Sequence, residues 1–501
     1  MTSPDPGSTS QLRSSRRVDW RVLLEDPNPR RAAIHGDDPA LAASLGTLGT
    51  RVVPVRSADL VVARNPSPAD IAQVARDATP RAAIVAELDG RMRSPRALSR
   101  VEGALRSSGR RLISLVAWPA IDECRELIPI SSAAREWWIS HHLGRRQPLT
   151  RAMARVADIP TRMVLPLIVV ALPADARSAV LALGAPSGLD VQLPWILLTP
   201  RYRASRHVVL LGNLSHGSAQ IVVKAARLRG DSSTTNEAAV LAALGRQPAM
   251  DGESVPRLLR ASEAAASLTG FAMSGLDGVP IAPGDLKRDP RIADLIRIWL
   301  RSLELDREMT DAIDPMSIAN ACARLETAAG VHDGLAGRVL AALSPLVEVA
   351  LPRTIEHGDM GPPNLLRRRD GGLGVIDWET GRLDGLPLVD LIFALGVIAA
   401  ARTDARQPHD QADAAGAAFA DGGWARTIID GEARRLGIAA GTVWPLIVAC
   451  WARQLGTMAA RQGVIGGPEA ADDAAHLLQH RYRLILERTL AGEDARRSRI
   501  S

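Results

Sequence analysis

The chain of 501 residues is long enough for two to four domains with sizeable cores. Hydrophobic residues make up 46% and charged residues 23%, which is ordinary for globular proteins and excludes a fibrous or broadly disordered chain. The formal charge of +6 comes from arginines spread along the sequence, without a basic block that carries interleaved aromatic residues, so we expect no nucleic-acid partner.

The spacing of the cysteines and the length of the apolar runs indicate in which cellular compartment the protein is expected. Cys124, Cys322 and Cys450 lie far apart and form no CxxC pair, which favours neither a disulfide framework nor a zinc site and fits the reducing cytoplasm. The longest apolar runs, such as residues 388–401, are shorter than the roughly 20 residues of a bilayer span, so we expect no membrane insertion. Residues 1–17 are rich in Ser, Pro and Arg and predict a flexible leader.

From about residue 31 to residue 115, short apolar runs alternate with Ala-rich helical stretches, which predicts a Rossmann-like α/β domain with a mostly parallel sheet at residues 18–180. The stretch "AAIHGDDPALAASLG", residues 32–46, has the strand, glycine and helix order of a dinucleotide or S-adenosylmethionine site, and the domain vaguely resembles a methyltransferase-like Rossmann domain. Gly36 stands alone there, without the further glycines that let a backbone approach such a ligand. This favours a degenerate scaffold or interaction domain over a ligand site.

A second kind of pattern begins near Val191. Apolar runs at residues 191–200, 208–213 and 220–227 predict antiparallel strands, residues 235–245 have helical spacing, and residues 267–278 predict a further strand that ends in a Gly-rich hinge. We therefore expect a lobe with an antiparallel sheet and one helix at residues 185–280. A mainly helical lobe should follow at 281–490, and a basic tail at 491–501.

The stretch "TIEHGDMGPPNLLRRRDGGLGVIDWETG", residues 354–381, carries the candidate chemistry. Two apolar strand-like runs each end in an acid, and Asp359 and Asn364 share a loop that two prolines stiffen. Phosphoryl transfer from a nucleotide requires a carboxylate beside the accepting hydroxyl and oxygen ligands for Mg²⁺, which neutralises charge on the phosphate oxygens. Asp359, Asn364 and Asp377 offer such a set.

The segments "HGDMGPPNLL", "VIDWE" and "GLPLVDL" resemble the aminoglycoside phosphotransferase and choline kinase family of small-molecule kinases. The resemblance spans residues 191–490 and implies an α+β bilobal protein-kinase-like domain after the α/β domain. It also implies that Asp359 is the catalytic base and that Asn364 and Asp377 bind Mg²⁺. His357 would brace the loop, and Asp390 would buttress it without touching substrate.

The same resemblance implies a nucleotide site in the preceding lobe. Lys224 is one of only two lysines in the chain and ends the strand-like run "QIVVK", where a kinase holds the nucleotide phosphates, and Glu237 is placed to pair with it. Ser205, in the turn "TPRYRASRH", would contact phosphate, and Met273, in "FAMSGLDG", would lie at the hinge beside adenine. That turn contains no glycine, and Gly361 replaces a histidine that many family members carry.

These features predict an ATP- and Mg²⁺-dependent kinase that phosphorylates a hydroxyl of a small molecule such as a sugar or an amino sugar. The alternative from another class is a pseudokinase, or nucleotide-binding scaffold, without turnover. A third possibility is an active N-terminal transferase. Since acids only slightly outnumber bases in the helical segments, a polycationic aminoglycoside is disfavoured as substrate.

Overall fold

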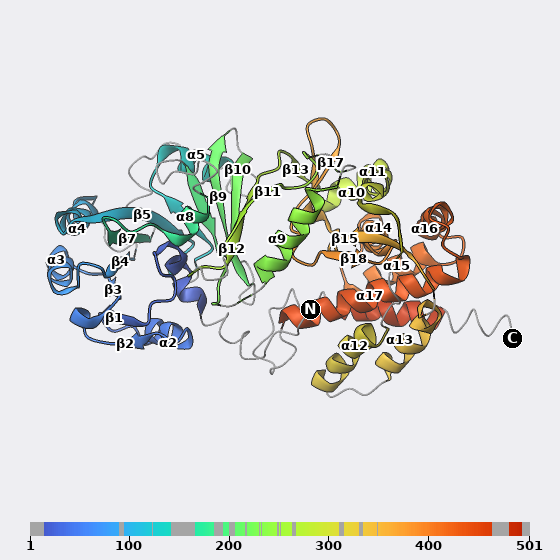
Figure 1. Ribbon diagram of the computed structural model, residues 1–501, viewed down its shortest axis with the longest axis horizontal. Coiled ribbons are helices and arrows are strands. Elements are labelled where there is room, and N and C mark those ends of the chain that lie inside the picture. Colours follow the sequence, from blue (N-terminus) through green and yellow to red (C-terminus); the bar gives the residue numbers. More distant parts are fainter. Residues whose placement is uncertain are drawn as a thin grey trace. The chain divides into compact units, whose positions relative to one another are not determined.

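The computed structural model divides the chain into two compact units, each described here by itself (Figure 1). The sheet unit comprises Gly7–Ala238 and Arg257–Gly275, and the helical unit comprises Met1–Pro6, Ala239–Pro256 and Leu276–Ser501. The structure describes residues 15–89, 95–122, 124–141, 166–184, 194–199, 206–215, 218–229, 231, 233–247, 250, 252–262, 267–309, 315–329, 334–347, 349–462 and 480–492.

The sheet unit is built on one 12-stranded sheet with the strand order β11-β12-β10-β9-β8-β6-β5-β7-β4-β3-β1-β2. Its first four strands are parallel: β1 (Arg31–His35), β2 (Arg51–Val52), β3 (Leu60–Arg64) and β4 (Ala83–Leu88). Helices α2 (Pro39–Thr47) and α3 (Pro68–Asp77) connect them. Both helices have proline in the first turn, where the missing N–H costs nothing, and α3 begins with a Ser67–Asp70 capping box.

The parallel arrangement ends at β4, so the expectation of a mostly parallel sheet is not confirmed. Strand β7 inserts antiparallel between β4 and β5, and β6 continues the antiparallel pairing. Every residue of β7 is buried, which explains why its sequence is a continuous apolar run and gives no sign of strand direction. The elements of this part are α4 (Pro95–Ser107), β5 (Arg110–Trp118), β6 (Glu126–Pro129), α5 (Ser132–His141), β7 (Leu167–Pro173) and α8 (Ala179–Gly184).

The predicted antiparallel lobe continues the same sheet, because β8 pairs with both β6 and β9. No sheet edge therefore separates the N-terminal strands from those that follow residue 194. The elements are β8 (Trp195–Leu198), β9 (His207–Ser215), β10 (Ser218–Ala226), α9 (Ser233–Leu244), β11 (Leu258–Ala261) and β12 (Gly270–Ser274).

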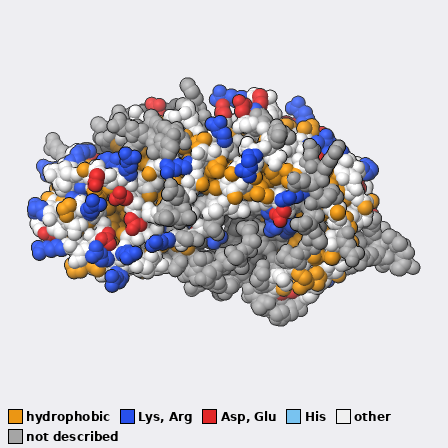
Figure 2. Space-filling view, viewed as in Figure 1, with side chains coloured by type: hydrophobic (Ala, Val, Ile, Leu, Met, Phe, Trp, Pro, Cys, Tyr) orange, Lys and Arg blue, Asp and Glu red, His pale blue; other side chains and the backbone are white. Residues whose placement is uncertain are grey.

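On the face of the molecule drawn in Figure 2, basic and acidic side chains of the sheet unit lie intermixed.

The segment expected to end a flexible leader is in fact packed. A 3-10 helix, η1 (Arg16–Leu23), begins inside the predicted leader, and Arg17 is buried. Its Ser- and Arg-rich sequence suggested exposure, but Arg17 is matched by buried carboxylates that lie far away along the chain. Residues 1–14 and the tail from residue 493 lie outside the described residues.

The helical unit surrounds two small sheets, β13-β16-β17 and β14-β15-β18. Its strands are β13 (Val279–Pro280), β14 (Glu304–Met309), β15 (Pro352–Glu356), β16 (Leu365–Arg367), β17 (Leu373–Val375) and β18 (Arg382–Gly385). Its helices are α10 (Pro283–Arg288), α11 (Arg291–Leu300), η4 (Arg301–Leu303), α12 (Pro315–Ala329), α13 (Leu335–Leu343), η5 (Ser344–Leu346), η6 (Pro362–Asn364), α14 (Val389–Arg402), α15 (Pro408–Phe419), α16 (Trp424–Arg435) and α17 (Ala440–Gln462).

Two sequence-based expectations concern features of the whole chain. All three cysteines, Cys124, Cys322 and Cys450, are free and buried. Among the described helices, none taken singly has the length and apolar character of a membrane span, and one bent pair, Trp424–Arg435 with Ala440–Met458, meets that test jointly.

Candidate active site

The loop after β15 carries the candidate catalytic aspartate. Gly358 has φ +81°, and a Cβ at this position would lie 2.9 Å from the carbonyl oxygen of Thr380. Only glycine combines this backbone conformation with so close an approach. The chain can therefore turn directly from β15 to Asp359, whose side chain remains partly exposed.

His357 is fully buried behind this turn. Its Nδ1 accepts a hydrogen bond from the Asp359 backbone N–H at 3.1 Å, so Nε2 carries the proton and donates to the Ile376 carbonyl at 3.0 Å. Its ring packs edge-on against Trp378, with centroids 4.6 Å apart. His357 thus joins the Asp359 loop to the strand end before Asp377, and it does so as a neutral ring.

Asp390, in the first turn of α14, holds the same loop from the other side. Its carboxylate accepts the backbone N–H groups of His357 at 2.6 Å and Gly358 at 2.8 Å. Burial, and then the neighbouring Glu356, raise the pKa of Asp390 to about 7, although the two N–H groups favour the ionised form. Gln454 of α17 donates to the Gly358 carbonyl at 2.7 Å, so the backbone around the turn is fixed at three points.

Asn364 and Asp377 provide the candidate metal ligands. The Asn364 side-chain amide donates to the Asp359 carbonyl at 2.9 Å, which leaves the amide oxygen as the group suited to a cation. The Ile376 N–H donates to the Asn364 carbonyl at 3.0 Å, so the two loops are tied together next to Asp377. Asp377 has φ +68°, a conformation that Asp tolerates better than most residues.

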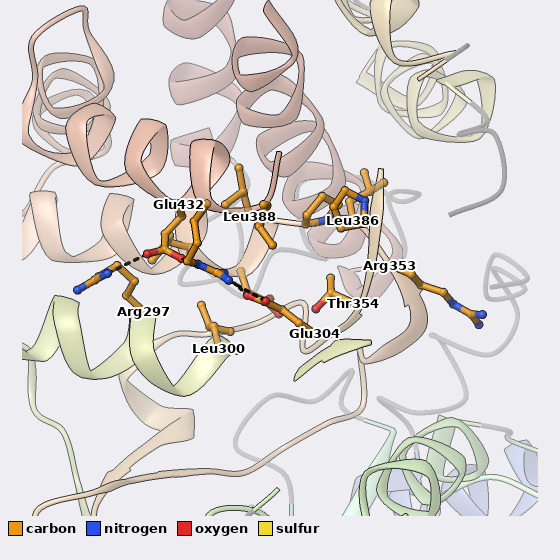
Figure 3. Close-up of a pocket in the computed structure, with 14 residues that line it drawn as sticks. Arg297, Leu300, Glu304, Arg353, Thr354, Leu386, Leu388 and Glu432 are labelled. Carbon is orange, nitrogen blue, oxygen red and sulfur yellow. Dashed lines mark hydrogen bonds and ion pairs between the residues drawn. The ribbon is translucent and has the colours of Figure 1, made fainter. Parts of the chain in front are cut away.

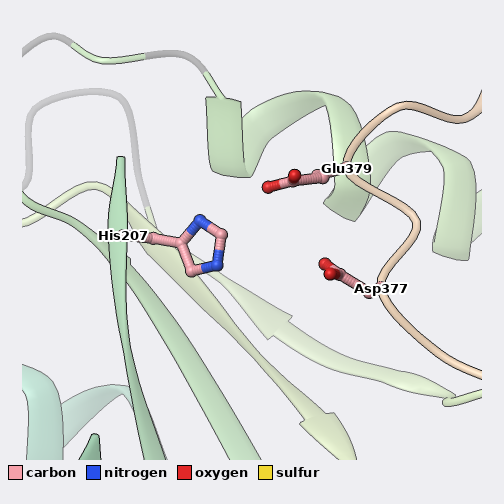
Figure 4. Close-up of side chains that lie close together, drawn as sticks. All are labelled: His207, Asp377 and Glu379. Carbon is pink, nitrogen blue, oxygen red and sulfur yellow. The ribbon is translucent and has the colours of Figure 1, made fainter. Parts of the chain in front are cut away.

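Figure 4 shows Asp377 and Glu379 side by side on the loop that follows β17. Both are partly exposed, whereas Trp378 between them is fully buried. Burial alternates along this loop because the Trp378 ring packs inward against His357. The side chains of Asp377 and Glu379, on either side of it, are therefore left partly exposed. The set of oxygen donors formed by Asn364 and Asp377 suits Mg²⁺, a hard cation that prefers carboxylate and amide oxygens.

In the sheet unit, the structure brings Lys224 and Glu237 together. The Lys224 Nζ lies 2.8 Å from both carboxylate oxygens of Glu237, and the two side chains are 7% and 1% exposed. Lys224 belongs to β10 and Glu237 to α9, so this pair fixes the helix against the strand. A buried lysine with a two-point carboxylate partner has a defined direction, which a surface lysine lacks.

Sequence reasoning missed the apolar surface on the face of the sheet that carries Lys224. Val209 is the β9 partner of Lys224, and Leu211 and Met273 flank Val222 in the register of β9, β10 and β12. Val209, Leu211 and Val222 are partly exposed, while their neighbours Val208, Leu210 and Val223 are fully buried on the opposite face. The period-two pattern of β9 and β10 could have identified this surface.

Of the two other residues predicted to contact the nucleotide, Met273 and Ser205, the structure describes only Met273. Met273 is 4% exposed and lies one residue before the end of β12. Ser205 and the turn at 200–205 lie outside the described residues.

A pocket in the helical unit borders Asp390 on the side of α11 and α16 (Figure 3). Ion pairs cross its wall: Arg297 donates to Glu432 at 2.8 Å, and Arg435 binds both Glu432 and Glu304. Every acid of this network already faces an arginine, so the pocket adds no group to the candidate catalytic set.

Comparison with protein families confirms the resemblance seen in the sequence. Residues 203–428 match the family model described as the phosphotransferase enzyme family. The match begins just before β9 and ends in α16, so it contains Lys224, Glu237 and the complete loop of Asp359. The resemblance of the N-terminal strands to a methyltransferase-like domain is not confirmed, and no protein of curated function matches the chain.

Several solved structures are similar at low identity. A thermostable mutant of aminoglycoside phosphotransferase APH(4)-Ia in ternary complex with ADP and hygromycin B is 16% identical, with 62% of this chain and 98% of that chain covered and a TM-score of 0.39. A choline/ethanolamine kinase family protein from Mesorhizobium loti is 14% identical, with coverage of 62% and 96% and a TM-score of 0.37. The choline kinase LicA from Streptococcus pneumoniae is 12% identical, with coverage of 59% and 92% and a TM-score of 0.37.

Proposed function

We propose that this protein is an ATP-dependent phosphotransferase that phosphorylates a hydroxyl group of a small molecule. The observation that carries the proposal is the buried pair of Lys224 and Glu237, 2.8 Å apart at both carboxylate oxygens. The chain uses arginine at nearly every basic position, yet it keeps a lysine here, and a compact ammonium group suits contact with phosphate oxygens. The family match over residues 203–428 supports the same class of reaction.

In this proposal, Asp359 accepts the proton of the substrate hydroxyl. The hydroxyl oxygen then forms a bond to the γ-phosphorus, the bond from that phosphorus to the β,γ-bridging oxygen breaks, and ADP leaves. The catalytic advantage comes from position, because His357, Asp390 and Gln454 hold the backbone around Asp359 through hydrogen bonds of 2.6–3.1 Å.

Asn364 and Asp377 would hold Mg²⁺, which neutralises charge on the phosphate oxygens when bound. The hydrogen bond from Asn364 to the Asp359 carbonyl uses the amide nitrogen, so the amide oxygen is the group that would bind the metal. Lys224 would hold the α- and β-phosphates. The apolar surface of Val209, Leu211 and Val222 suits the face of an adenine ring.

The experiment combines MgATP binding by calorimetry with a screen of hydroxylated metabolites for ADP release. Metal-dependent ATP binding together with turnover on at least one alcohol is the expected result. ATP binding without turnover on any alcohol would instead support the alternative, a pseudokinase. The turn at residues 199–207, which contains no glycine, is compatible with that alternative. Failure to bind ATP at any Mg²⁺ concentration would refute the proposal.

A further inference from the structure

The N-terminal segment Ser15–Leu24 covers one face of the sheet that carries Lys224. Val18, Trp20 and Leu23 are at most 2% exposed and belong to the same hydrophobic core as Val208 and Val223. Helix α8 contacts η1, β10 and β12, and the Ala179 N–H donates to the Leu24 carbonyl at 2.9 Å. Because side chains alternate along a strand, this face of β10 lies opposite to Lys224.

A buried charge network joins that segment to β10. Arg227 follows the end of the strand, three residues after Lys224, and is 1% exposed. Its Nε donates to an Asp19 carboxylate oxygen at 3.0 Å, and its Nη2 donates to the Ser15 hydroxyl at 3.3 Å. Arg21 donates to the Arg227 carbonyl and to the same Asp19 oxygen. Loss of one charge from such a network leaves its partner buried and uncompensated.

The backbone of Arg227 continues this connection to β9. The Arg227 N–H donates to the Arg206 carbonyl at 2.8 Å, and the Arg206 Nε donates to Asp231 at 3.0 Å. Arg206 directly precedes β9 and follows the turn expected to contact phosphate. One clamp, formed by Asp19 and Arg227, therefore fixes the end of β10 and the entry to β9 together.

A second contact fixes the residues that follow η1. The Ser267 hydroxyl donates to the Glu25 carbonyl, and the Asn28 side-chain amide donates to the Ser267 carbonyl, both at 3.3 Å. Ser267 lies in the turn before β12, which is the neighbour of β10 on the side away from β9. The N-terminal segment and the residues that follow it thus contact the end of β10 and the turn before β12.

We infer that Asp19 and Arg227 are positioning residues for the phosphate-holding Lys224, and that the N-terminal segment completes the nucleotide-binding lobe instead of serving a separate domain. This inference rests on the proposed function. Neither residue touches the nucleotide, since both lie on the covered face of the sheet. They act by fixing the end of β10, and so the direction from which Lys224 meets the phosphates.

The test uses the full chain and the variant Asp19→Asn, with MgATP and adenosine as probes in calorimetry. Mutations in a coupled network change binding by about 0.5–2 kcal/mol, so MgATP should bind about two- to thirtyfold more weakly. Adenosine lacks phosphates and should bind as to the wild type. The matched control is Asp59→Asn, which removes a surface ion pair with Arg31 and should leave both affinities unchanged.

The outcomes separate the inference from the proposed function. Equal weakening of MgATP and adenosine would show a general structural role and overturn the inference, as would unchanged MgATP binding. If the Asp19→Asn variant does not fold, the same two binding measurements on the Arg227→Lys variant test the inference. This variant keeps the positive charge but loses the planar guanidinium group, so it should weaken the binding of MgATP and leave the binding of adenosine unchanged. An Arg227→Lys variant that binds MgATP as tightly as the wild type would overturn the inference. A wild-type protein that binds no MgATP would overturn the proposed function itself.

Discussion

Two clusters of acids at strand ends differ in what surrounds them. In the sheet unit, Glu87 at the end of β4 is fully buried and binds Arg17 at 2.6 Å, while Asp38 binds Arg64 at 2.5 Å. In the helical unit, Asp359 and Asp377 follow strand ends and remain partly exposed. Their supporting groups, such as His357, make the buried contacts instead.

The difference identifies which cluster can meet a ligand. The first cluster lies where an open α/β sheet usually binds its ligand, beyond the carboxyl ends of parallel strands. Here Arg17 of η1 fills that place, and Trp20 donates to Glu87 at 3.1 Å. The lone Gly36, with φ +103°, turns the chain into α2, whose N-terminus is capped by Asp38 from within the protein. We therefore interpret the first cluster as structural and the second as chemical.

The largest effect should follow the change Asp359→Asn in the chemical cluster. It removes the proposed base, so turnover should fall by about 10²–10⁴-fold while MgATP still binds. ADP formation and calorimetry measure the two properties. Asp370→Asn, in the exposed turn between β16 and β17, is the control and should retain full turnover. Asp359→Asn turnover within about threefold of the wild type would contradict the assignment.

Next in size is Glu87→Gln in the structural cluster. It removes the two-point partner of Arg17, which keeps Asp38 and Asp122, so the change should cost about 1.5–3 kcal/mol of unfolding free energy. Urea unfolding measures this loss, and Asp89→Asn, at a partly exposed acid, should cost at most about 1 kcal/mol. If Glu87→Gln were as stable as Asp89→Asn, the two clusters would not differ in the way we describe.

Lys224→Arg sharpens the comparison at the proposed phosphate contact. The planar guanidinium keeps the charge but cannot reproduce the position of the ammonium group, and a misplacement of about 1 Å can cost on the order of 10²-fold in turnover. Lys287→Arg, at the exposed lysine paired with Asp404, should be silent. Equal ADP formation by the two variants would make Lys224 an ordinary charge and remove the main support for the proposed function.

The smallest effect concerns pH and extends the comparison to Glu432, a structural acid of the helical unit (Figure 3). Burial opposes ionisation, but hydrogen bonds from Arg301, Arg297 and Arg435 lower the pKa of Glu432 to about 2. A lowered pKa means that its stabilisation is complete above the ordinary value of 4.5 and is lost as the pH falls toward 2.

The check is acid unfolding of the wild type beside Glu432→Gln. The stability difference between them should be constant at neutral pH and shrink between about pH 4.5 and 2. A difference that does not change over this interval would contradict the expected contribution of the three arginines.

The sequence alone determined the local features of this protein. The apolar runs predicted β8, β9, β10 and β12, and the spacing of Asp359, Asn364 and Asp377 identified the candidate loop, because local periodicity and motif spacing are properties of neighbouring residues. The pairing of Lys224 with Glu237 was implied by the resemblance to the kinase family.

Only the tertiary structure decided how distant segments pair. It placed β7 antiparallel beside β4, joined β8 to β6 in one sheet, and buried Arg17 and Asp19 against residues up to 208 positions away. A fully apolar strand carries no sign of its partner or direction, and a charged residue near the chain start looks exposed until its buried partner is known. These choices depend on packing and charge pairing across the whole unit, which no local pattern contains.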